Sequence, residues 1–448
     1  MSKVTHDNEQ YEVVNKKSAG IDVHRDFVSA TVIIETEEKG IYTAYQEFET
    51  NKKSLLQLRD WLLGNGCTVV GLESTGKYWY PVYFALETHM QVNVYNARNM
   101  RNIPGKKTDK KDSEWIAKLT RHALIMPSYI PIQHIRDARL YARERKALVK
   151  ERGSVRQRIL SILDSAGIKL SSVMSDVFGV SGRNLLELLV SGKRVSSRQV
   201  ADRVYGPLKD KIDDLISAMD GYQRESHIFL LKLAIEQELY LTTRIEQIEK
   251  KLSEFLIVSE EDKAILNRII TIPGFSERSG TLLLAEVGFD LQAFPSNKQF
   301  CSWLGLAPGR KESAGKNVSG KIQVRQRYLR ALLIEVALAA TKCKGTYVRA
   351  KYWHLKANIG GNKAVVAIAH YLAKAVYRAL KEEKVFQELT EDYASVRQIN
   401  KDLKQLSRIT KRLGKDATKA YIDSESDNVL TEVEQKKLQI CHIGIVTH

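Results

Sequence analysis

The order of strand-like and helix-like segments over the first part of the chain constrains its fold more than any other feature. Three consecutive segments rich in β-branched residues are typical of strands: 19–24, 27–34 and 41–48. A helical segment, a compact apolar run, a second helical segment and a strand-like segment then follow in turn: 51–63, 67–73, 78–90 and 91–95. The order βββαβαβ, with a further helix that begins near Thr108, predicts a mixed-sheet α/β domain.

Two long amphipathic helices are expected in the middle of the chain, over 134–163 and 228–255. The second carries Ile245, Ile248 and Leu252 at the spacing of a coiled-coil stripe. Two interpretations remain open for this stripe: a helical hairpin within the chain, or an interface between subunits. The expected organisation has five parts: a polar leader over 1–17, the α/β domain over 18–130, a helical coiled-coil section over 131–262, a mainly helical domain over 263–388, and a charged extension over 389–448.

Charge indicates the partner. Lys and Arg total 70 against 53 for Asp and Glu, which gives a net charge of +17. A positive field of this size favours nucleic acid. No stretch long enough to span a bilayer lacks charges, and the polar start of the chain does not resemble a secretion signal, so we expect a cytoplasmic protein without a membrane partner. The four cysteines form no CxxC pair, which favours packing thiols over zinc ligands.

Four carboxylates form the candidate site. Asp22 lies in the apolar first strand, Glu73 ends the central apolar run, and Asp109 and Asp112 are three residues apart on one face of the helix that follows. Carboxylates gathered at one sheet edge repel one another unless a cation neutralises them, and hard oxygen ligands select Mg²⁺ or Mn²⁺. Each acid alone also has a structural explanation, as a turn cap, an ion-pair partner or a residue at a helix start. The four together predict a metal site.

The segments that carry these acids resemble the DEDD transposases of insertion sequences, relatives of the Piv DNA invertase. The resemblance rests on AGIDVH at 19–24, GLESTG at 71–76 and KKTDKKDS at 106–113. It continues through RERKALVKER at 143–152, IPGF at 272–275, WLGLAP at 303–308, SAGK at 313–316 and RYLR at 327–330. It covers residues 18 to about 385.

The resemblance implies a RuvC/RNase H-like fold for the α/β domain and a nucleophilic serine in the C-terminal domain, which matches Ser313. It further implies strand exchange through a phosphoserine link, DNA as donor and target, and a structured bridge RNA as guide. Dimers that pair into a tetrameric synaptic complex, in a prokaryotic cytoplasm and in action at the nucleoid, are also implied.

Ser313 lies in a basic loop that is well suited to grip a phosphate. A serine hydroxyl is a weak nucleophile unless a base, a metal ion or a positive setting activates it. Ser319 is the nearest alternative, because the loop departs from the usual family pattern: Ala314-Gly315 stands where the family usually has two glycines, and KIQVRQ at 321–326 stands where it has a lysine-glycine segment. The cations expected to contact nucleic acid lie in this loop, at the start of the third motif and on the basic helix: Lys107, Arg145, Arg152, Arg156, Arg310, Lys311, Lys316, Lys321, Arg325 and Arg327.

Two other functions fit the same residues. In a RuvC-like junction nuclease, metal-activated water would cut the DNA and Ser313 would only bind it. In a nucleic-acid scaffold protein, the acids would hold a metal for structure alone. The leading prediction is a transposase that uses the four carboxylates and the serine.

Overall fold

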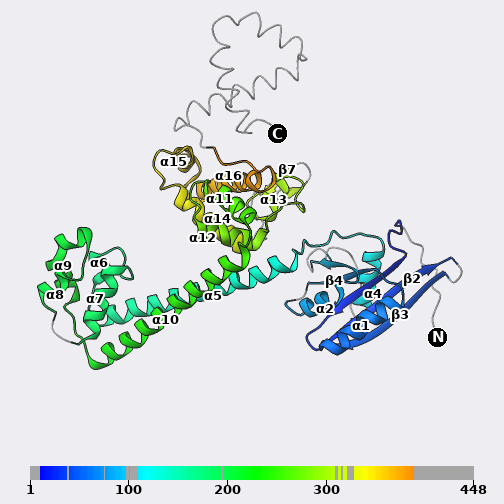
Figure 1. Ribbon diagram of the computed structural model, residues 1–448, viewed down its shortest axis with the longest axis horizontal. Helices are drawn as coiled ribbons and strands as arrows, with labels where there is room; N and C mark the ends of the chain where they lie inside the picture. Colours follow the sequence, from blue (N-terminus) through cyan, green and yellow to red (C-terminus); the bar gives the residue numbers. More distant parts are fainter. Residues whose placement is uncertain are drawn as a thin grey trace, which may run out of the picture. The chain divides into compact units, whose positions relative to one another are not determined.

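A computed structural model of all 448 residues gives the structure of the protein (Figure 1). It describes residues 11–37, 40–74, 76–96, 100, 109–192, 195–307, 311–313, 316–319 and 327–387, with the backbone alone at 109–111, 311–313, 316–319 and 327. The chain forms two compact units, Met1–Ile130 and Pro131–His448. The expected extension at 389–448 lies outside the described residues, as does most of the expected leader.

A five-stranded mixed sheet is the centre of the first unit. Its strands are β1 (Lys17–Val23), β2 (Phe27–Thr36), β3 (Gly40–Glu49), β4 (Val69–Glu73) and β5 (Gln91–Tyr95). The order across the sheet is β3-β2-β1-β4-β5, with β2 antiparallel to β1 and β3, and β4 parallel to β1 and β5. This arrangement confirms the predicted α/β domain with an RNase H-like mixed sheet, in which β1 is the middle strand.

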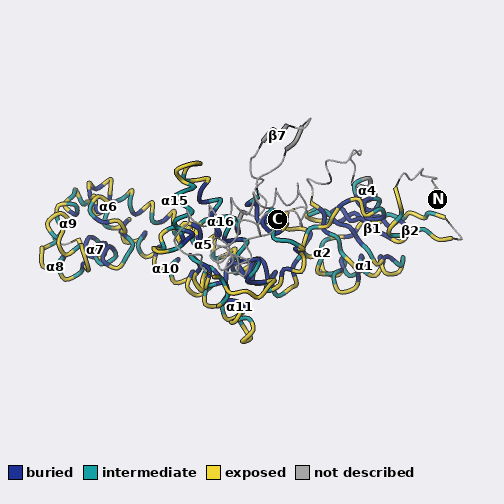
Figure 2. The backbone as a smooth tube through the Cα atoms, turned by 90° about the horizontal axis from the view of Figure 1, so that it is seen from above, coloured by how far each residue is buried: buried dark blue, intermediate teal, exposed yellow. Residues whose placement is uncertain are grey.

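Helices cover both faces of this sheet. The helices of this unit within its described residues are α1 (Lys52–Gly64), α2 (Trp79–Leu86) and α4 (Asp109–Arg121). Along β1, Ala19, Ile21 and Val23 share one buried cluster with residues of α1 and α2. The alternate residues of β1 face α4, because successive side chains of a strand point to opposite faces. β1 is therefore buried on both sides, as its dark blue trace in Figure 2 shows.

A long helical hairpin begins the second unit. Helices α5 (Gln133–Ser165) and α10 (Glu225–Leu256) lie side by side in Figure 1. They run antiparallel, since Arg145 contacts Glu249 and Arg156 contacts Glu238. The apolar stripe predicted on the second helix is buried between these helices of one chain, at Leu231, Leu241, Ile245 and Leu252. The structure thus shows the intrachain hairpin, one of the two interpretations left open.

Short helices fill the interval between α5 and α10, where the sequence has no clear hydrophobic period. They are α6 (Leu170–Val173), α7 (Val180–Val190), α8 (Ser197–Ala201), the 3₁₀ helix η1 (Gly206–Lys211) and α9 (Ile212–Met219). Their apolar residues share one buried cluster with the end of α5 and the start of α10.

The C-terminal helices pack on the opposite end of the hairpin. They are α11 (Glu260–Ile270), α12 (Glu277–Val287), α13 (Asn297–Trp303), α14 (Arg327–Ala340), α15 (Tyr347–Ile359) and α16 (Gly361–Lys381). Their core includes Ile135 and Ala142 of α5 and Leu256 of α10. Within the expected polar loop the structure has two short strands, β6 (Lys311–Ser313) and β7 (Lys316–Ser319). In the described parts of the chain, no helix combines the length and the apolar character that crossing a bilayer requires.

Candidate active site

Sheet register brings Asp22 and Glu73 to the same level. The parallel ladder between β1 and β4 pairs Gly20 with Gly71 and Ile21 with Leu72. Asp22 and Glu73 are the next residues on these neighbouring strands, so their side chains point to the same face of the sheet. Asp22 is only 8% exposed, and Glu73 is half-buried. An acid this deeply buried at the middle of a sheet requires hydrogen bonds, a partner charge or a metal ion.

The same face of the sheet carries α4. Ser18 donates from Oγ to the carbonyl oxygen of Ala117 at 3.4 Å, and the hydroxyls of Thr31 and Ser113 are 2.7 Å apart. Thr31 is the ladder partner of Gly20, so Ser113 lies near Gly20 while Ala117 reaches back to Ser18. The helix therefore runs antiparallel to β1.

This direction places the start of α4 toward the end of β1 that carries Asp22. Asp109 and Asp112 lie in the first turn of the helix, immediately before Ser113. Asp112 is half-buried, and Asp109 is described by its backbone alone. Thr108, the expected cap of this helix, lies outside the described residues.

Two glycines allow α4 to approach the sheet this closely. A Cβ atom at Gly20 would lie 2.1 Å from the backbone nitrogen of Ala117 and 2.2 Å from the carbonyl oxygen of Ser113. A Cβ atom at Gly71 would lie 2.1 Å from the hydroxyl oxygen of Thr120. Any larger side chain at either position would push the helix, and with it Asp112, away from the sheet.

His24 also contacts the site, although it is not among the site residues predicted from the sequence. Its Nε2 atom lies 3.1 Å from Oδ2 of Asp22. The ring stacks on Phe27, with 4.5 Å between ring centroids, and the backbone nitrogen of His24 donates to the carbonyl oxygen of Phe27 at 3.0 Å. The signal was present in the sequence, because residues two apart on an extended chain share a face.

The oxygen-rich donor set fits a hard divalent cation such as Mg²⁺. Asp22 and Glu73 come from adjacent strands, and the close approach at Gly20 directs a third carboxylate, Asp112, toward them. Among the described side chains, no three of His, Cys, Asp or Glu already form a metal-binding group, and Asp109 does not belong to that set.

The predicted nucleophile lies on the second unit. In the β6–β7 hairpin Ser313 pairs with Lys316, next to the turn, whereas Ser319 pairs with Lys311 at the other end of the ladder. The backbone thus distinguishes the two serines by position, one beside the turn and one at the base. Residues 314 and 315 of the turn lie outside the described residues.

Three of the predicted nucleic-acid contacts lie on α5 and also hold the hairpin together. The Arg145 guanidinium lies 2.5 Å from Glu249, and Arg156 lies 2.6 Å from Glu238. Arg152 donates to the Thr242 hydroxyl at 3.2 Å. Burial, followed by the charge of nearby Arg156, lowers the pKa of Arg152.

The other predicted contacts have no described side chain. Lys311, Lys316 and Arg327 are described by their backbone only, whereas four others lie outside the described residues: Lys107, Arg310, Lys321 and Arg325. Nucleic-acid binding by this set stays a prediction.

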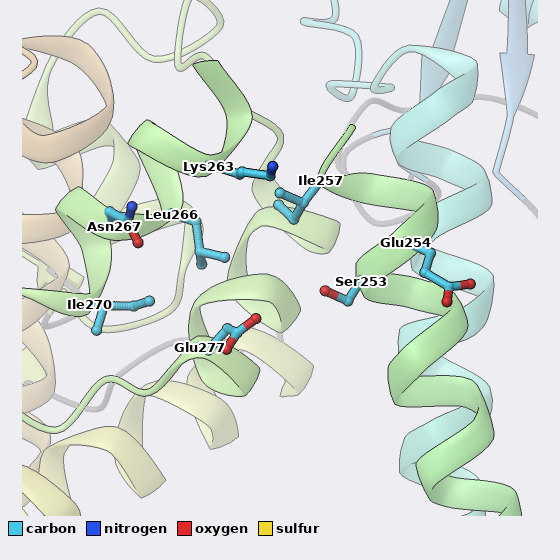
Figure 3. A pocket seen from close by; sticks show the side chains of 8 residues that line it. All are labelled: Ser253, Glu254, Ile257, Lys263, Leu266, Asn267, Ile270 and Glu277. Atoms are coloured by element: carbon cyan, nitrogen blue, oxygen red, sulfur yellow. The ribbon is translucent and has the colours of Figure 1, made fainter. Parts of the chain in front are cut away.

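A surface pocket of about 440 Å³ lies between the end of α10, one side of α11 and the start of α12 (Figure 3). Its lining combines apolar and charged side chains, among them Ser253, Lys263, Leu266 and Glu277. None of the residues predicted for catalysis or nucleic-acid contact lines this pocket.

Both segments that carry the candidate site residues match known transposase families. Residues 19–168, which include all four carboxylates, match a DEDD family profile described as "Transposase". Residues 266–353, which include Ser313, match a profile described as "Transposase IS116/IS110/IS902 family". A "Probable family 20 transposase" from Pseudomonas aeruginosa is 27% identical over 151 residues, which is 33% of this chain. The match spans 43% of that relative, less than half of its length.

Proposed function

This chain belongs to the DEDD transposases of the IS110 type, and from that premise we propose that it is the recombinase of a mobile element, which cuts and exchanges DNA strands. One observation carries the proposal. Asp22 and Glu73 lie level on adjacent strands, and the start of α4, with Asp109 and Asp112, is directed toward them.

The four carboxylates would hold Mg²⁺ or Mn²⁺, which when bound neutralises negative charge at a phosphodiester. The chain's own residues prepare this site: His24 contacts one oxygen of Asp22, and Gly20 lets α4 approach the sheet. The negative carboxylates repel one another, and a bound cation relieves this repulsion, which favours metal binding.

Ser313 is the proposed nucleophile. Its Oγ forms a bond to phosphorus and loses its proton, and one P–O bond of the DNA breaks to release a hydroxyl end. Attack by the hydroxyl of another strand on the phosphoserine then re-forms a DNA linkage and frees the serine. We expect Lys311 and Lys316, which belong to the same hairpin, to neutralise the extra negative charge.

Guidance by a bridge RNA and a tetrameric assembly belong to the proposal through the family resemblance. The net charge of +17 supports binding of both nucleic acids. The proposed setting is the cytoplasm of a prokaryotic cell.

The test combines the full chain, Mg²⁺, candidate guide RNA and DNA that spans the element junction. We expect a protein–DNA adduct that survives denaturation and maps to Ser313. Ser313→Ala should abolish the adduct, and Ser319→Ala, in the same hairpin, is the matched control that should retain it.

Asp22→Asn should lower the yield of the adduct by at least ~100-fold and leave DNA binding intact. Loss of a carboxylate that would hold the metal slows the cleavage step without weakening the affinity for DNA. Continued cutting by Ser313→Ala would replace the proposal with a junction nuclease that uses activated water. Stable nucleic-acid complexes of the wild type that never give a strand product would favour a scaffold protein.

A further inference from the structure

A lysine enclosed by two tyrosine rings lies between α15 and α16. The Nζ atom of Lys351 is 4.1 Å from the centroid of the Tyr371 ring and 5.5 Å from that of Tyr347. The two rings lie 5.8 Å apart and are tilted by 48°. Lys351 and Tyr347 are four residues apart on α15, so they share one face of that helix, which packs against α16.

Two further basic side chains, on α16, lie close enough to this lysine for charge interactions. His370 and Lys374 are one helical turn apart, and Tyr371 lies beside them on the same helix. We name the two lysines, Lys351 and Lys374, together with the neutral ring of His370 and the rings of Tyr347 and Tyr371, the α15–α16 cation cluster.

The electrostatics of this cluster are one-sided. Burial, and then the charge of Lys374, lowers the pKa of Lys351 to about 8. Burial, and then Lys374 and Lys351, lowers the pKa of His370 to about 4. The charged neighbours that act on both groups are thus cations. Tyrosine rings attract a cation only weakly compared with a full negative charge.

A half-buried group of cations is costly for a fold to keep, because it combines desolvation with like-charge repulsion. An anion bound among the cations would offset both the desolvation cost and the like-charge repulsion. A phosphate diester suits the arrangement, since its two non-bridging oxygens can accept hydrogen bonds from two lysines at once.

We propose that the α15–α16 cation cluster binds a phosphate of a nucleic-acid backbone, with Lys351 and Lys374 as its donors. The inference rests on the proposed function, which supplies nucleic acid as the polyanion. It adds a contact on α16, beyond the end of the second family match at residue 353. The chemistry is shared by DNA and RNA, so the experiment contains an arm for each.

The test measures binding of the full-length chain to a labelled random-sequence DNA duplex and to a labelled RNA hairpin, by fluorescence anisotropy over a salt series. Lys351→Met keeps the length of the side chain and removes its charge. Lys356→Met is the matched control, because Lys356 is an exposed lysine on the same helix that lies 4.5 Å over the Trp353 ring. Lys351→Arg restores a cation that can lie over tyrosine.

We expect Lys351→Met to weaken binding roughly ten-fold, the size of one charge-assisted contact. The slope of log affinity against log salt should fall by about one. Lys351→Arg and Lys356→Met should bind within about two-fold of the wild type. The nucleic acid for which Lys351→Met loses affinity, DNA or RNA, identifies the source of the phosphate.

Circular dichroism and thermal melting of Lys351→Met separate loss of binding from loss of folding. We expect its melting temperature to equal or exceed that of the wild type, since the substitution removes a desolvated like charge. Equal binding by wild type, Lys351→Met and Lys356→Met would overturn the phosphate site and leave the proposed function intact. Failure of the wild type to bind either nucleic acid would overturn both.

Discussion

His24 is positioned to orient Asp22. Its Nε2 atom lies 3.1 Å from one oxygen of Asp22, and contacts of this kind to a metal ligand typically contribute 10–100-fold to metal affinity or activity. The stacked Phe27 ring and the backbone hydrogen bond to Phe27 fix His24 in this orientation.

We therefore expect His24→Leu to lower the rate of DNA strand cleavage by ~10-fold or more. His24→Gln, which keeps a side-chain donor, should recover most of the activity. Cleavage measured over a range of Mg²⁺ concentrations checks this, because a lost positioning contact should raise the metal concentration needed for half-maximal rate. Leucine and glutamine variants with the same metal dependence as the wild type would show that His24 only packs.

Two cysteines are predicted to be inert. Burial raises the pKa of Cys67 and of Cys301 to about 11, with a small opposing effect from nearby Lys17 and Lys374 respectively. The thiolate is the reactive form, so both should resist iodoacetamide at neutral pH. Cys343, which is half-exposed, should be alkylated first among these three. Peptide mass spectrometry, with a urea-unfolded sample as control, measures the order, and early labelling of Cys67 would contradict the packing of the first unit.

At the scale of elements, the contact between α4 and the sheet determines where Asp112 lies. We expect Gly20→Ala to destabilise the protein by about 1–3 kcal/mol, since the added methyl group meets the backbone of Ala117 and Ser113 rather than a flexible side chain. Cleavage should be lost at temperatures at which the protein is still folded, because α4 must move. Gly64→Ala is the control, as no atom lies within 4 Å of its Cβ position. Urea denaturation and the cleavage assay together test this, and an active, fully stable Gly20→Ala would refute the close approach.

One buried acid of α10, Glu238, joins that helix to α5 and α7. Glu238 is 4% exposed and lies 2.6 Å from Arg156 and 3.2 Å from Arg183. Removal of its charge leaves both guanidiniums without this partner, which for partly exposed arginines should cost about 1–3 kcal/mol.

We expect Glu238→Gln to lower the free energy of unfolding by that amount in urea titrations. Glu254→Gln, at an exposed pair 3.9 Å from Lys250 on the same helix, should change it by less than ~0.5 kcal/mol. Equal effects of the two substitutions would show that the buried network adds no stability to the hairpin.

The elements that the sequence predicted are those with a clear hydrophobic period. Alternation and β-branched residues indicated the strands of the sheet, and the helical period indicated both long helices. Residues 165–225 were not resolved from sequence, because helices as short as Leu170–Val173 and Ser197–Ala201 contain too little periodicity to recognise. The sequence predicts a loop around Ser313 where the structure has a hairpin, since polar strands of three and four residues are specified by their ladder and not by an apolar pattern.

The candidate site divides in the same way. The motifs predict which four carboxylates form the site, and the ladder between β1 and β4 in the structure brings Asp22 and Glu73 to the same level. The partners of Arg145 and Arg156 could not be inferred, because the acids they contact lie on a helix 104 and 82 residues away in sequence. The net charge includes those arginines among the cations that could bind nucleic acid, whereas the structure shows that each also forms an ion pair within the hairpin.

At the scale of the whole molecule, acid should destabilise the unit that contains α16. His370 has a pKa of about 4 in the folded protein against an ordinary value of 6.5, through burial first and the charges of Lys374 and Lys351 second. The unfolded chain therefore binds a proton between pH 6.5 and 4 that the folded chain does not. Stability from this group is complete above pH 6.5, is lost as the pH falls through that window, and does not fall further below pH 4.

The full difference corresponds to roughly 3 kcal/mol, and solvent screening of an incompletely buried ring reduces it to about 1–2 kcal/mol. His370→Gln, which stays neutral at every pH, should remove this part of the acid sensitivity. Hydrogen–deuterium exchange of α16 peptides in urea, at pH 6.5 and at about pH 4, resolves the effect in this unit alone once intrinsic exchange rates are corrected for pH. The strands of the first unit should show the same change with pH in wild type and variant. If α16 loses as much protection in His370→Gln as in the wild type, the imidazole is already hydrated in the native state and the buried cations around it are not desolvated.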